Sequence, residues 1–356
     1  MNTSHSFKDA TVVVVGGAGF VGSTLCHRVL ADAPARLVIV DNLLSADMCN
    51  VPTAPNVDFI LGSIAHESVL RKLPREANYV FHLATYHGNQ SSIADPIADH
   101  DNNTLTTLML FDWIKDFGAL RKVVYSSAGC TVAQKTFEDA EATTEDAPVS
   151  LYHDSPYQIS KIVGEFYGNY YLLRYKLPFV KARFQNVYGP REILGAGRWR
   201  GTPATVWRNV TPTFIWKSLR HEALPVENGG IATRDFIFVD DIVEGLVACA
   251  LRGAPGEVYN LASGVETSIL ELANEVNALT GNPTAIALTP ARPWDRSGKR
   301  HGSPDKAARE IGFAARVGLR DGLAKTVQWT RDNEAVIRRC MAQHAWYLPE
   351  LRGAGA

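Results

Sequence analysis

The chain has 356 residues, of which 46% are hydrophobic and 21% charged, values typical of an enzyme-sized protein with one large domain or a main domain and a smaller companion. The formal net charge of −1 provides no broad basic surface, which argues against nucleic acid as a partner. The sequence has no apolar run long enough to span a membrane and no signal-peptide pattern. We therefore expect a cytoplasmic protein without membrane contact.

Five cysteines lie far apart in the sequence, at positions 26, 49, 130, 249 and 340. Their odd number and wide spacing indicate reduced thiols rather than a disulfide framework, in keeping with a cytosolic protein. No cluster of cysteine, histidine or acidic residues has the spacing of metal ligands, so we expect no bound metal.

A short apolar run, Thr11-Val12-Val13-Val14-Val15, is typical of a strand buried on both faces of a parallel sheet. The glycine-rich segment 16–22 follows it directly, and residues 23–30 are expected to form a helix. Glycines at positions 16, 19 and 22 let a backbone turn tightly and approach a pyrophosphate at a helix N-terminus. This strand, loop and helix predict a dinucleotide-binding site.

The second expected strand, residues 36–40, ends at Asp41. A carboxylate at this place can accept hydrogen bonds from the ribose of an adenosine and would repel a 2′-phosphate. The sequence therefore favours NAD over NADP.

Strand and helix patterns alternate through the first half of the chain. Strands are expected at 57–61, 79–83, 122–126 and 179–184, with helices at 67–73, 98–117 and 156–175 between them. This alternation predicts an α/β fold, a Rossmann-like doubly wound parallel sheet whose ligands collect at the carboxyl ends of the strands.

The last third of the chain is more mixed, with strands expected at 235–239 and 258–261 and helices at 212–220, 242–251 and 319–330. We expect a smaller mixed α/β C-terminal substrate-binding domain. The expected division is an NAD-binding domain at 1–183, with returning segments from the C-terminal half, a substrate-binding region at 184–345 and a tail at 346–356.

The stretch 154–161 reads as the start of a helix that carries a proton-transfer site. Ser155 can cap the helix, and Pro156 suits its first position. Tyr157 and Lys161 stand four apart, so a helix places their side chains on one face. An ammonium about 4 Å away is worth roughly 4 kcal/mol, or about three pKa units in favour of the phenolate, at an effective dielectric of ~20. Tyr157 could then act as a base toward a sugar hydroxyl.

Further motifs follow in order: His82-Leu83-Ala84-Thr85, Tyr125-Ser126-Ser127 and Arg183-Phe184-Gln185-Asn186-Val187-Tyr188-Gly189-Pro190. With the glycine loop, Asp41 and the Tyr157/Lys161 pair, they resemble the extended short-chain dehydrogenase/reductase family, more narrowly its nucleotide-sugar epimerases and dehydratases. The resemblance reaches to about Thr330 and implies NAD as cofactor and a nucleotide-diphosphate sugar, preferably a UDP-sugar, as substrate. It also implies a homodimer, paired through the helix of Tyr157 and the long helix before it.

The same resemblance implies roles for individual residues. Ser127 matches the hydroxyl that hydrogen-bonds the reacting sugar, Tyr157 the base, and Lys161 the residue that holds the nicotinamide ribose. Expected contacts of the cofactor are Gly16, Gly19, Phe20, Val21, Gly22, Asp41, Asn42, Ser63, Ile64, Leu83, Ala84, Thr85, Asn103, Tyr157 and Lys161. Expected contacts of the substrate are Ser92, Ser127, Asn186, Arg191, Arg198, Arg200, Arg234 and Arg292.

The sequence departs from the family pattern at three places. Ser63 stands where an aspartate usually contacts the adenine, Thr106 replaces a frequent glycine beside Asn103, and Thr131-Val132 replaces a common Tyr-Gly pair. The first of these departures puts the adenine contact through Ser63 in doubt.

Ser127 is followed by Ala128, Gly129 and Cys130, where similar dehydratases carry an Asp-Glu pair and decarboxylases a nearby Glu. The resemblance therefore favours C4 epimerisation through a transient 4-keto sugar, because hydride return to the other face needs no further base. The alternatives are a 3,5-epimerase that uses Cys130, a dehydratase, decarboxylase or reductase of the same family, or an NAD-binding sensor without turnover.

The segment 191–208 should border the sugar, since it follows Asn186 directly. Trp199 could stack on the sugar, and Arg198 or Arg200 could bind a carboxylate, which suits a uronic acid or another decorated sugar. The alternative is a solvated loop whose arginines meet only the diphosphate or a partner subunit.

Overall fold

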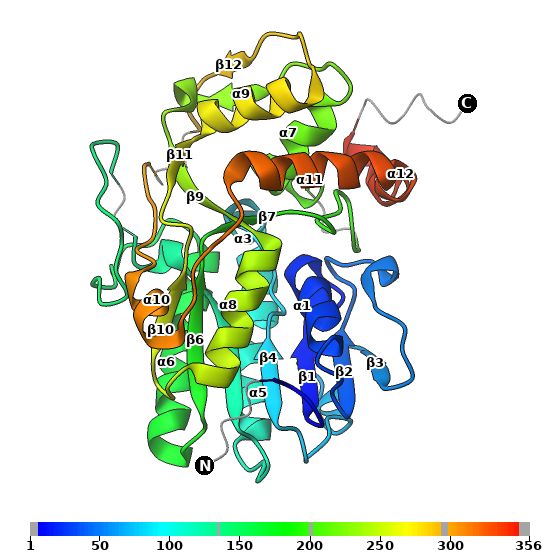
Figure 1. Ribbon diagram of the computed structural model, residues 1–356, viewed down its shortest axis with the longest axis vertical. Helices are drawn as coiled ribbons and strands as arrows, with labels where there is room; N and C mark the ends of the chain where they lie inside the picture. The colour runs from blue at the N-terminus through cyan, green and yellow to red at the C-terminus, as the bar shows by residue number, and fades with distance from the viewer. Residues whose placement is uncertain (1–5, 134–135, 199–201, 293–297, 349–356) are drawn as a thin grey trace.

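The computed structural model describes residues 6–133, 136–198, 202–292 and 298–348. Its large sheet has seven strands in the order β10-β6-β5-β4-β1-β2-β3 (Figure 1). Every neighbouring pair in this sheet is parallel. The strands are β1 (Thr11–Val15), β2 (Arg36–Asp41), β3 (Val57–Leu61), β4 (Tyr79–His82), β5 (Lys122–Ala128), β6 (Phe179–Phe184) and β10 (Val258–Leu261). This confirms the predicted α/β fold with a parallel sheet.

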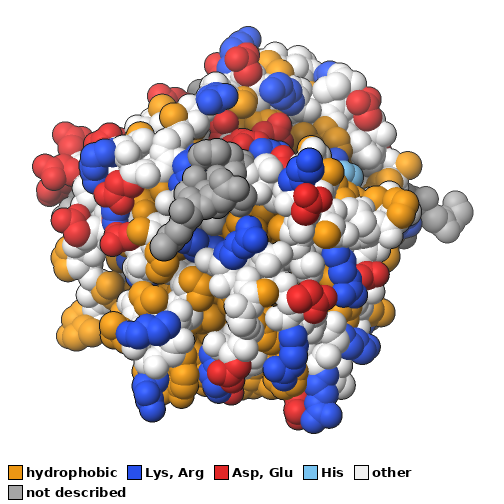
Figure 2. Space-filling model, turned by 60° about the horizontal axis from the view of Figure 1, so that its bottom comes forward, with side chains coloured by type: hydrophobic (Ala, Val, Ile, Leu, Met, Phe, Trp, Pro, Cys, Tyr) orange, Lys and Arg blue, Asp and Glu red, His pale blue; other side chains and the backbone are white. Residues whose placement is uncertain are grey.

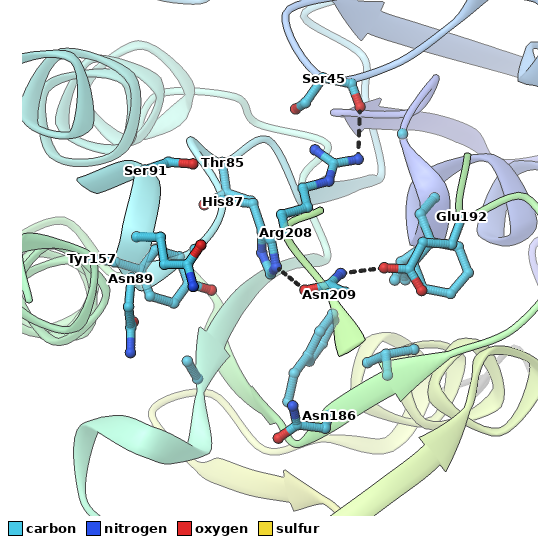
Figure 3. Close-up of a pocket in the computed structure, with 18 of the residues that line it drawn as sticks. Ser45, Thr85, His87, Asn89, Ser91, Tyr157, Asn186, Glu192, Arg208 and Asn209 are labelled. Carbon is cyan, nitrogen blue, oxygen red and sulfur yellow. Dashed lines mark hydrogen bonds between the residues drawn. The ribbon is translucent and has the colours of Figure 1, made fainter. Parts of the chain in front are cut away.

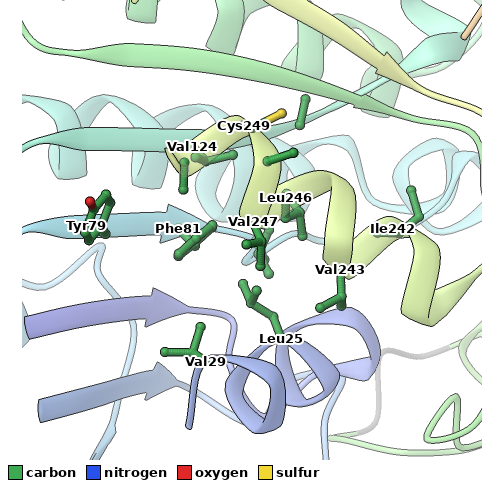
Figure 4. Close-up of a cluster of buried hydrophobic side chains, with 14 of the residues drawn as sticks. Leu25, Val29, Tyr79, Phe81, Val124, Ile242, Val243, Leu246, Val247 and Cys249 are labelled. Carbon is green, nitrogen blue, oxygen red and sulfur yellow. The ribbon is translucent and has the colours of Figure 1, made fainter. Parts of the chain in front are cut away.

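Helices cover both faces of this sheet. On one face, α1 (Phe20–Leu30) and α8 (Val239–Arg252) lie side by side, and Leu25, Leu246 and Phe81 of β4 belong to one buried apolar cluster (Figure 4). On the other face, Phe111 packs on Tyr125 of β5 and Phe179 of β6, and Tyr171 packs on Phe111. The helices of that face are α2 (Glu67–Leu70), α5 (Thr106–Ile114) and α6 (Pro156–Tyr175). The wholly apolar strands follow from this double coverage, since neither face is wetted.

The smaller half of the molecule lies above the carboxyl ends of the large sheet (Figure 1). Its three-stranded sheet has the order β11-β9-β7, with one parallel and one antiparallel pair, and β8 pairs with β12. These strands are β7 (Asn186–Tyr188), β8 (Pro225–Glu227), β9 (Thr233–Phe238), β11 (Glu266–Ser268) and β12 (Ala287–Thr289). The helices are α7 (Val210–Ser218), α9 (Ile269–Thr280), α11 (Leu319–Asp332) and α12 (Glu334–Ala342).

The chain crosses between the halves more than once, because α8, β10 and α10 (Asp305–Ile311) return to the large sheet. Returning segments were expected from the sequence. The domain bounds at 183 and 345 stay a prediction.

The helix expected over 98–117 is interrupted. It consists of α4 (Pro96–Asp99), a π-helical stretch (His100–Leu105) and α5, after a short α3 (Asn89–Ala94). Thr106 and Thr107 turn their hydroxyls back to the carbonyls of Asn102 and Asn103, at 2.7 and 2.6 Å. Such bonds compete with the helical ladder, which accounts for the irregular turn.

The surface carries both charges interspersed, with apolar side chains between them on the face that Figure 2 presents. All five cysteines are free thiols. Within the described ranges, no helix is long and apolar enough to cross a membrane, and no group of three metal-ligating side chains comes together.

Candidate active site

A cavity of about 670 Å³ opens where the carboxyl ends of the large sheet face the smaller half (Figure 3). The glycine loop, the ends of β2, β4 and β5, and the start of α6 line it from below. Strands β7 and β9 and the start of α7 line it from the other half. Parallel sheets bind ligands at this edge, as the strand pattern predicted.

The glycine loop brings backbone to the cavity without side chains. Gly16 has φ +86°, and a Cβ there would stand 2.4 Å from the amide nitrogen of Ala84. A Cβ on Gly22 would stand 2.0 Å from the carbonyl oxygen of Gly16. Helix α1 begins directly after Gly19, so its free N–H groups and dipole favour an anion at the cavity wall. The loop therefore fits a dinucleotide diphosphate.

Asp41 ties this loop to the end of β2. Its Oδ2 accepts a hydrogen bond from the amide of Ala18 at 3.0 Å, and its Oδ1 accepts one from Leu43 at 2.8 Å. Burial raises the pKa of this carboxyl, and the backbone donors oppose the rise. Asp41 and Asn42 both line the cavity, so the carboxylate fits the adenosine ribose of the cofactor.

Most of the other expected cofactor contacts also line the cavity: Gly16, Gly19, Phe20, Val21, Gly22, Ser63, Ile64, Leu83, Ala84, Thr85, Tyr157 and Lys161. Asn103 does not. Its amide group accepts from Thr85 and Tyr86 and donates to Asp99 and Ser160. Asn103 therefore holds the loop after β4 against α6 and positions the cavity wall from behind.

Tyr157 and Lys161 lie on one face of α6, whose N-terminus is capped by Ser155 through the amide of Gln158. The Lys161 Nζ donates to the carbonyl of Ser126 at 2.9 Å and lies 5.8 Å from the centroid of the Tyr157 ring. Burial lowers the pKa of Lys161 to about 8 and raises the pKa of Tyr157 well above its usual value.

The expected preference for the phenolate is thus not found in this structure. Desolvation of the buried Tyr157 side chain is the largest cause of its raised pKa. A protonated phenol beside an ammonium is suited to hand a proton to a carbonyl oxygen, and the reverse transfer uses the same pair.

The Ser127 hydroxyl forms a hydrogen bond within the protein that the sequence did not predict. Its Oγ donates to Glu165 Oε1 at 2.5 Å, and Glu165 also forms a two-point ion pair with Arg183, both at 2.9 Å. Ser127 is 2% exposed, although it borders the cavity. Cys130 lines the cavity too, and a thiolate there would help to raise the pKa of Tyr157.

Three of the expected substrate residues line the cavity from the smaller half: Asn186, Arg234 and Arg292. The Arg234 Nη1 donates to the carbonyls of Thr233 and Gly298, at 2.6 and 2.8 Å. Arg292 forms an ion pair with Glu227. Arg300, which the sequence did not single out, also lines the cavity.

Three other expected substrate residues do not reach the cavity: Ser92, Arg191 and Arg198. Ser92 is fully buried, and its hydroxyl donates to the carbonyl of Asn89 within α3. Ser91 faces the cavity instead, and its buried hydroxyl has no hydrogen-bond partner among the residues that the structure describes. Arg198 is exposed. Arg200 and Trp199 lie outside the described residues.

A polar chain that the sequence did not indicate crosses the cavity (Figure 3). The Asn209 amide donates to Glu192 Oε1, and its Oδ1 faces His87 Nε2 at 3.0 Å. The His87 ring lies 5.7 Å from that of Tyr157. Burial raises the pKa of Glu192 to about 7. No local pattern could reveal this chain, because His87 follows β4 whereas Glu192 and Asn209 lie far away in the sequence, in the connection between β7 and α7.

The comparisons with known proteins agree with this site. The family model described as "NAD dependent epimerase/dehydratase family" matches residues 12–262. The chain belongs to this family. Its expected relationship to nucleotide-sugar epimerases and dehydratases is thereby confirmed.

The epimerase/dehydratase relatives include solved structures. The enzyme WbmF of Bordetella bronchiseptica, in complex with NAD+ and UDP, is 57% identical, with a TM-score of 0.87, over 96% of this chain and 98% of that one. An epimerase of Methanothermobacter thermautotrophicus is 36% identical, with a TM-score of 0.86, over 95% and 97%. The UDP-glucose 4-epimerase of Mycolicibacterium smegmatis is 33% identical over 90% of this chain and 98% of its own length.

NAD is the cofactor of this protein, as the sequence predicted. The glycine loop, Asp41 and the end of β4 fit the dinucleotide, and Tyr157 and Lys161 lie on the same cavity. Bound NAD supplies hydride transfer to and from an alcohol carbon. The protein is an NAD-dependent nucleotide-sugar modifying enzyme.

Proposed function

We propose that this protein is an NAD-dependent epimerase of a nucleotide-diphosphate sugar, preferably a UDP-sugar, and that it inverts C4 through a transient 4-keto sugar. One observation carries the proposal. Tyr157 and Lys161 line the cavity beside the end of β5, where Ala128, Gly129 and Cys130 bring no carboxylate. The end of β5 therefore brings no carboxylate to the Tyr157/Lys161 pair, whereas similar dehydratases carry an Asp-Glu pair there for elimination.

C4 epimerisation needs only this equipment. In this chemistry the phenolate form of Tyr157 would take the proton of the C4 hydroxyl, and bound NAD would take the hydride from C4 itself. The 4-keto sugar would then receive the hydride on the other face of C4 and the proton on its oxygen. Two relatives support the choice, since one is named UDP-glucose 4-epimerase and the WbmF structure contains UDP.

A second candidate, inversion at C3 or C5 of a keto sugar, is favoured by Cys130. This thiol lines the cavity, and its thiolate would interact electrostatically with both Tyr157 and Lys161, whereas the Ser127 hydroxyl donates its hydrogen bond to Glu165. Inversion beside a ketone requires removal of a proton from carbon, a step for which a thiolate is suited.

The two chemistries differ in their exchange with solvent. We would incubate the enzyme with UDP-, GDP-, dTDP- and CDP-sugars in deuterium oxide and analyse products by NMR and mass spectrometry. The proposal expects inversion at C4 with no deuterium on carbon and no change of mass. Deuterium at C3 or C5 would select the second candidate, and loss of water or carbon dioxide would show a dehydratase or decarboxylase. If the protein binds NAD but converts none of the sugars, the NAD-binding sensor without turnover would remain as the alternative.

An acidic or otherwise decorated sugar stays a prediction of the sequence. The hypothesis of a carboxylate contact was based on Arg198 or Arg200. Arg198 is exposed and does not line the cavity, so the hypothesis now depends on Arg200. The hypothesis expects a nucleotide-linked uronate to be preferred over the neutral hexose by about 1.5–3 kcal/mol in kcat/KM. Equal kcat/KM for the two sugars would refute the hypothesis of a carboxylate contact.

We also infer a homodimer, paired through α6 and its neighbour α5. Phe166, Tyr170 and Leu173 of α6 are 54%, 51% and 74% exposed, which leaves an apolar strip on the surface, whereas Ile162 is buried. Light scattering should give a dimer, and Leu173→Glu should give a monomer of 39.0 kDa. A monomeric wild type at micromolar concentration would refute the pairing. The cytoplasmic location expected from the sequence belongs to this proposal and stays a prediction.

A further inference from the structure

The connection between β7 and α7, described at residues 191–198 and 202–209, packs on the cofactor side of the molecule, and we call it the strap. The amide of Arg198 donates to the carbonyls of Leu43 and Leu44, at 3.3 and 3.1 Å. The Asn50 side chain donates to the carbonyl of Arg191 at 3.3 Å. The strap thus crosses from the substrate half to the loop that follows Asp41.

Close backbone contact on both sides holds the strap in place. Gly197 has φ +101°, and a Cβ there would stand 2.3 Å from the carbonyl oxygen of Leu44. A Cβ on Gly195 would stand 2.7 Å from the backbone of Met341 in α12. His344 Nε2 lies 3.0 Å from the carbonyl oxygen of Gly195. The strap is therefore clamped between α12 and the loop after β2.

Two charged side chains of the strap line the cavity, Glu192 and Arg208. Glu192 is 6% exposed, and its Oε2 has no hydrogen-bond partner among the described residues. Among the same residues Arg208 has one hydrogen bond, from Nη2 to the carbonyl of Ser45 at 3.5 Å (Figure 3). A guanidinium has five N–H donors, so most donors of Arg208 are left for a ligand.

The position of Arg208 indicates which anion it would meet. Ser45 belongs to the loop that follows Asp41 and Asn42, and this loop lines the cavity together with the N-terminus of α1. A helix N-terminus and a guanidinium on one cavity favour a diphosphate.

Three further arginines line the cavity from other segments than Arg208: Arg234 of β9, Arg292 and Arg300. Arg234 bonds to the carbonyl of Gly298, and the amide of Arg300 bonds to Thr233. The enzyme must hold two diphosphates, one in NAD and one in the sugar nucleotide. Arg208 on its own and the group of Arg234, Arg292 and Arg300 match these two ligands.

We propose that Arg208 is a ligand of the NAD diphosphate, carried across the cavity by the strap from the substrate half of the chain. Glu192 balances part of the buried charge and orients Asn209 beside Arg208. The strap thereby holds the cofactor in the protein. Retention suits an enzyme that regenerates NAD in each cycle, a consequence that rests on the proposed function, whereas the contact itself requires only that NAD binds.

The test compares Arg208→Gln with Arg309→Gln, which removes an exposed arginine on α10 away from the cavity. We would measure the NAD content of the purified proteins and the Kd of the apoproteins for NAD, adenosine and UDP. Arg208→Gln should bind NAD about tenfold to a hundredfold more weakly, the scale of a lost charged hydrogen bond. Its affinity for adenosine, which has no diphosphate, and for UDP should stay close to that of wild type.

Wild-type affinity for NAD in Arg208→Gln would overturn the proposal. Loss of UDP affinity with NAD unchanged would assign Arg208 to the substrate, and would equally overturn it. If the single variant does not fold, as judged by circular dichroism, the double variant Arg208→Met/Glu192→Gln removes both buried charges and should show the same loss of NAD. These binding measurements do not depend on which sugar carbon is inverted.

Discussion

The glycine loop at 16–22 and the strap reach the same cavity by opposite means. The loop contributes backbone, and its close approaches at Gly16 and Gly22 leave no room for a Cβ. The strap contributes the side chains of Glu192 and Arg208, and it is held in place by contacts with Leu44 and Met341 that lie far away in the sequence.

The difference shows how a binding site becomes visible in a sequence. Where backbone geometry performs the binding, only glycine is tolerated, so the residue type reports the function. Where side chains from an irregular segment perform it, many sequences could serve, and the neighbours are set by the fold. The following predictions separate these two kinds of contribution.

The largest effect is expected at Tyr157, which lies on a regular helix and belongs to neither segment. Tyr157→Phe keeps the ring and removes the proton, so kcat should fall roughly a thousandfold, within the range for general acid-base catalysis. NAD content and UDP affinity should persist. Cys130→Ala is the matched comparison and should matter little for a C4 epimerase. Activity that survives in the phenylalanine variant would exclude Tyr157 as the proton-transfer group.

A single added methyl group in the glycine loop should weaken NAD binding. Gly22→Ala places a Cβ 2.0 Å from the carbonyl oxygen of Gly16, and overpacking of this kind costs about 1–3 kcal/mol. NAD binding should weaken roughly tenfold to a hundredfold, measured as NAD content and Kd. Gly118→Ala, where a Cβ has nothing within 4 Å, is the control. Equal NAD affinity in the two variants would contradict the close-approach argument.

Acid should destabilise the sheet below the glycine loop. His82 is 1% exposed, and burial, with a smaller contribution from the Lys161 charge, lowers its pKa to about 3. The unfolded chain therefore binds the proton more tightly, so the free energy of unfolding falls as the pH drops below about 6.5 toward 3. From about pH 7 to about pH 5 the loss is about 2 kcal/mol, at roughly 1.4 kcal/mol per pH unit.

Urea denaturation of wild type and His82→Gln at the two pH values measures this term. The variant starts from its own stability, and its dependence on pH should be flatter by the stated amount. Parallel curves for the two proteins would show that His82 does not control the acid response.

The smallest effect on NAD binding is expected at Asp41, whose side chain supports the backbone of the glycine loop. Asp41→Ala removes the carboxylate that lines the cavity and holds the amide of Ala18. NAD should bind about tenfold more weakly, and discrimination against NADP should relax, because the negative charge that repels a 2′-phosphate is gone. Titration calorimetry with NAD and with NADP measures both affinities. Wild-type enzyme that binds NADP as tightly as NAD would contradict the assignment.

The sequence by itself determined the elements whose signal is local. The strands of the parallel sheet, the glycine loop, Asp41 at the end of β2, and Tyr157 with Lys161 on one turn of α6 depend on short-range periodicity and spacing. The same reasoning missed the short strands β7, β8, β11 and β12, since three residues are too few to show a period.

Only the tertiary structure decided which polar side chains meet. Arg208 and Ser45 are 163 residues apart in the sequence, and Asn209 and His87 are 122 apart. It also decided that the Ser127 hydroxyl bonds to Glu165 and that Ser91, not Ser92, faces the cavity. Burial raised the pKa of Tyr157 against the effect expected of Lys161. Desolvation and contacts between distant segments are properties of the packed chain, and for that reason a motif can place a side chain on an element without giving its partners or its proton affinity.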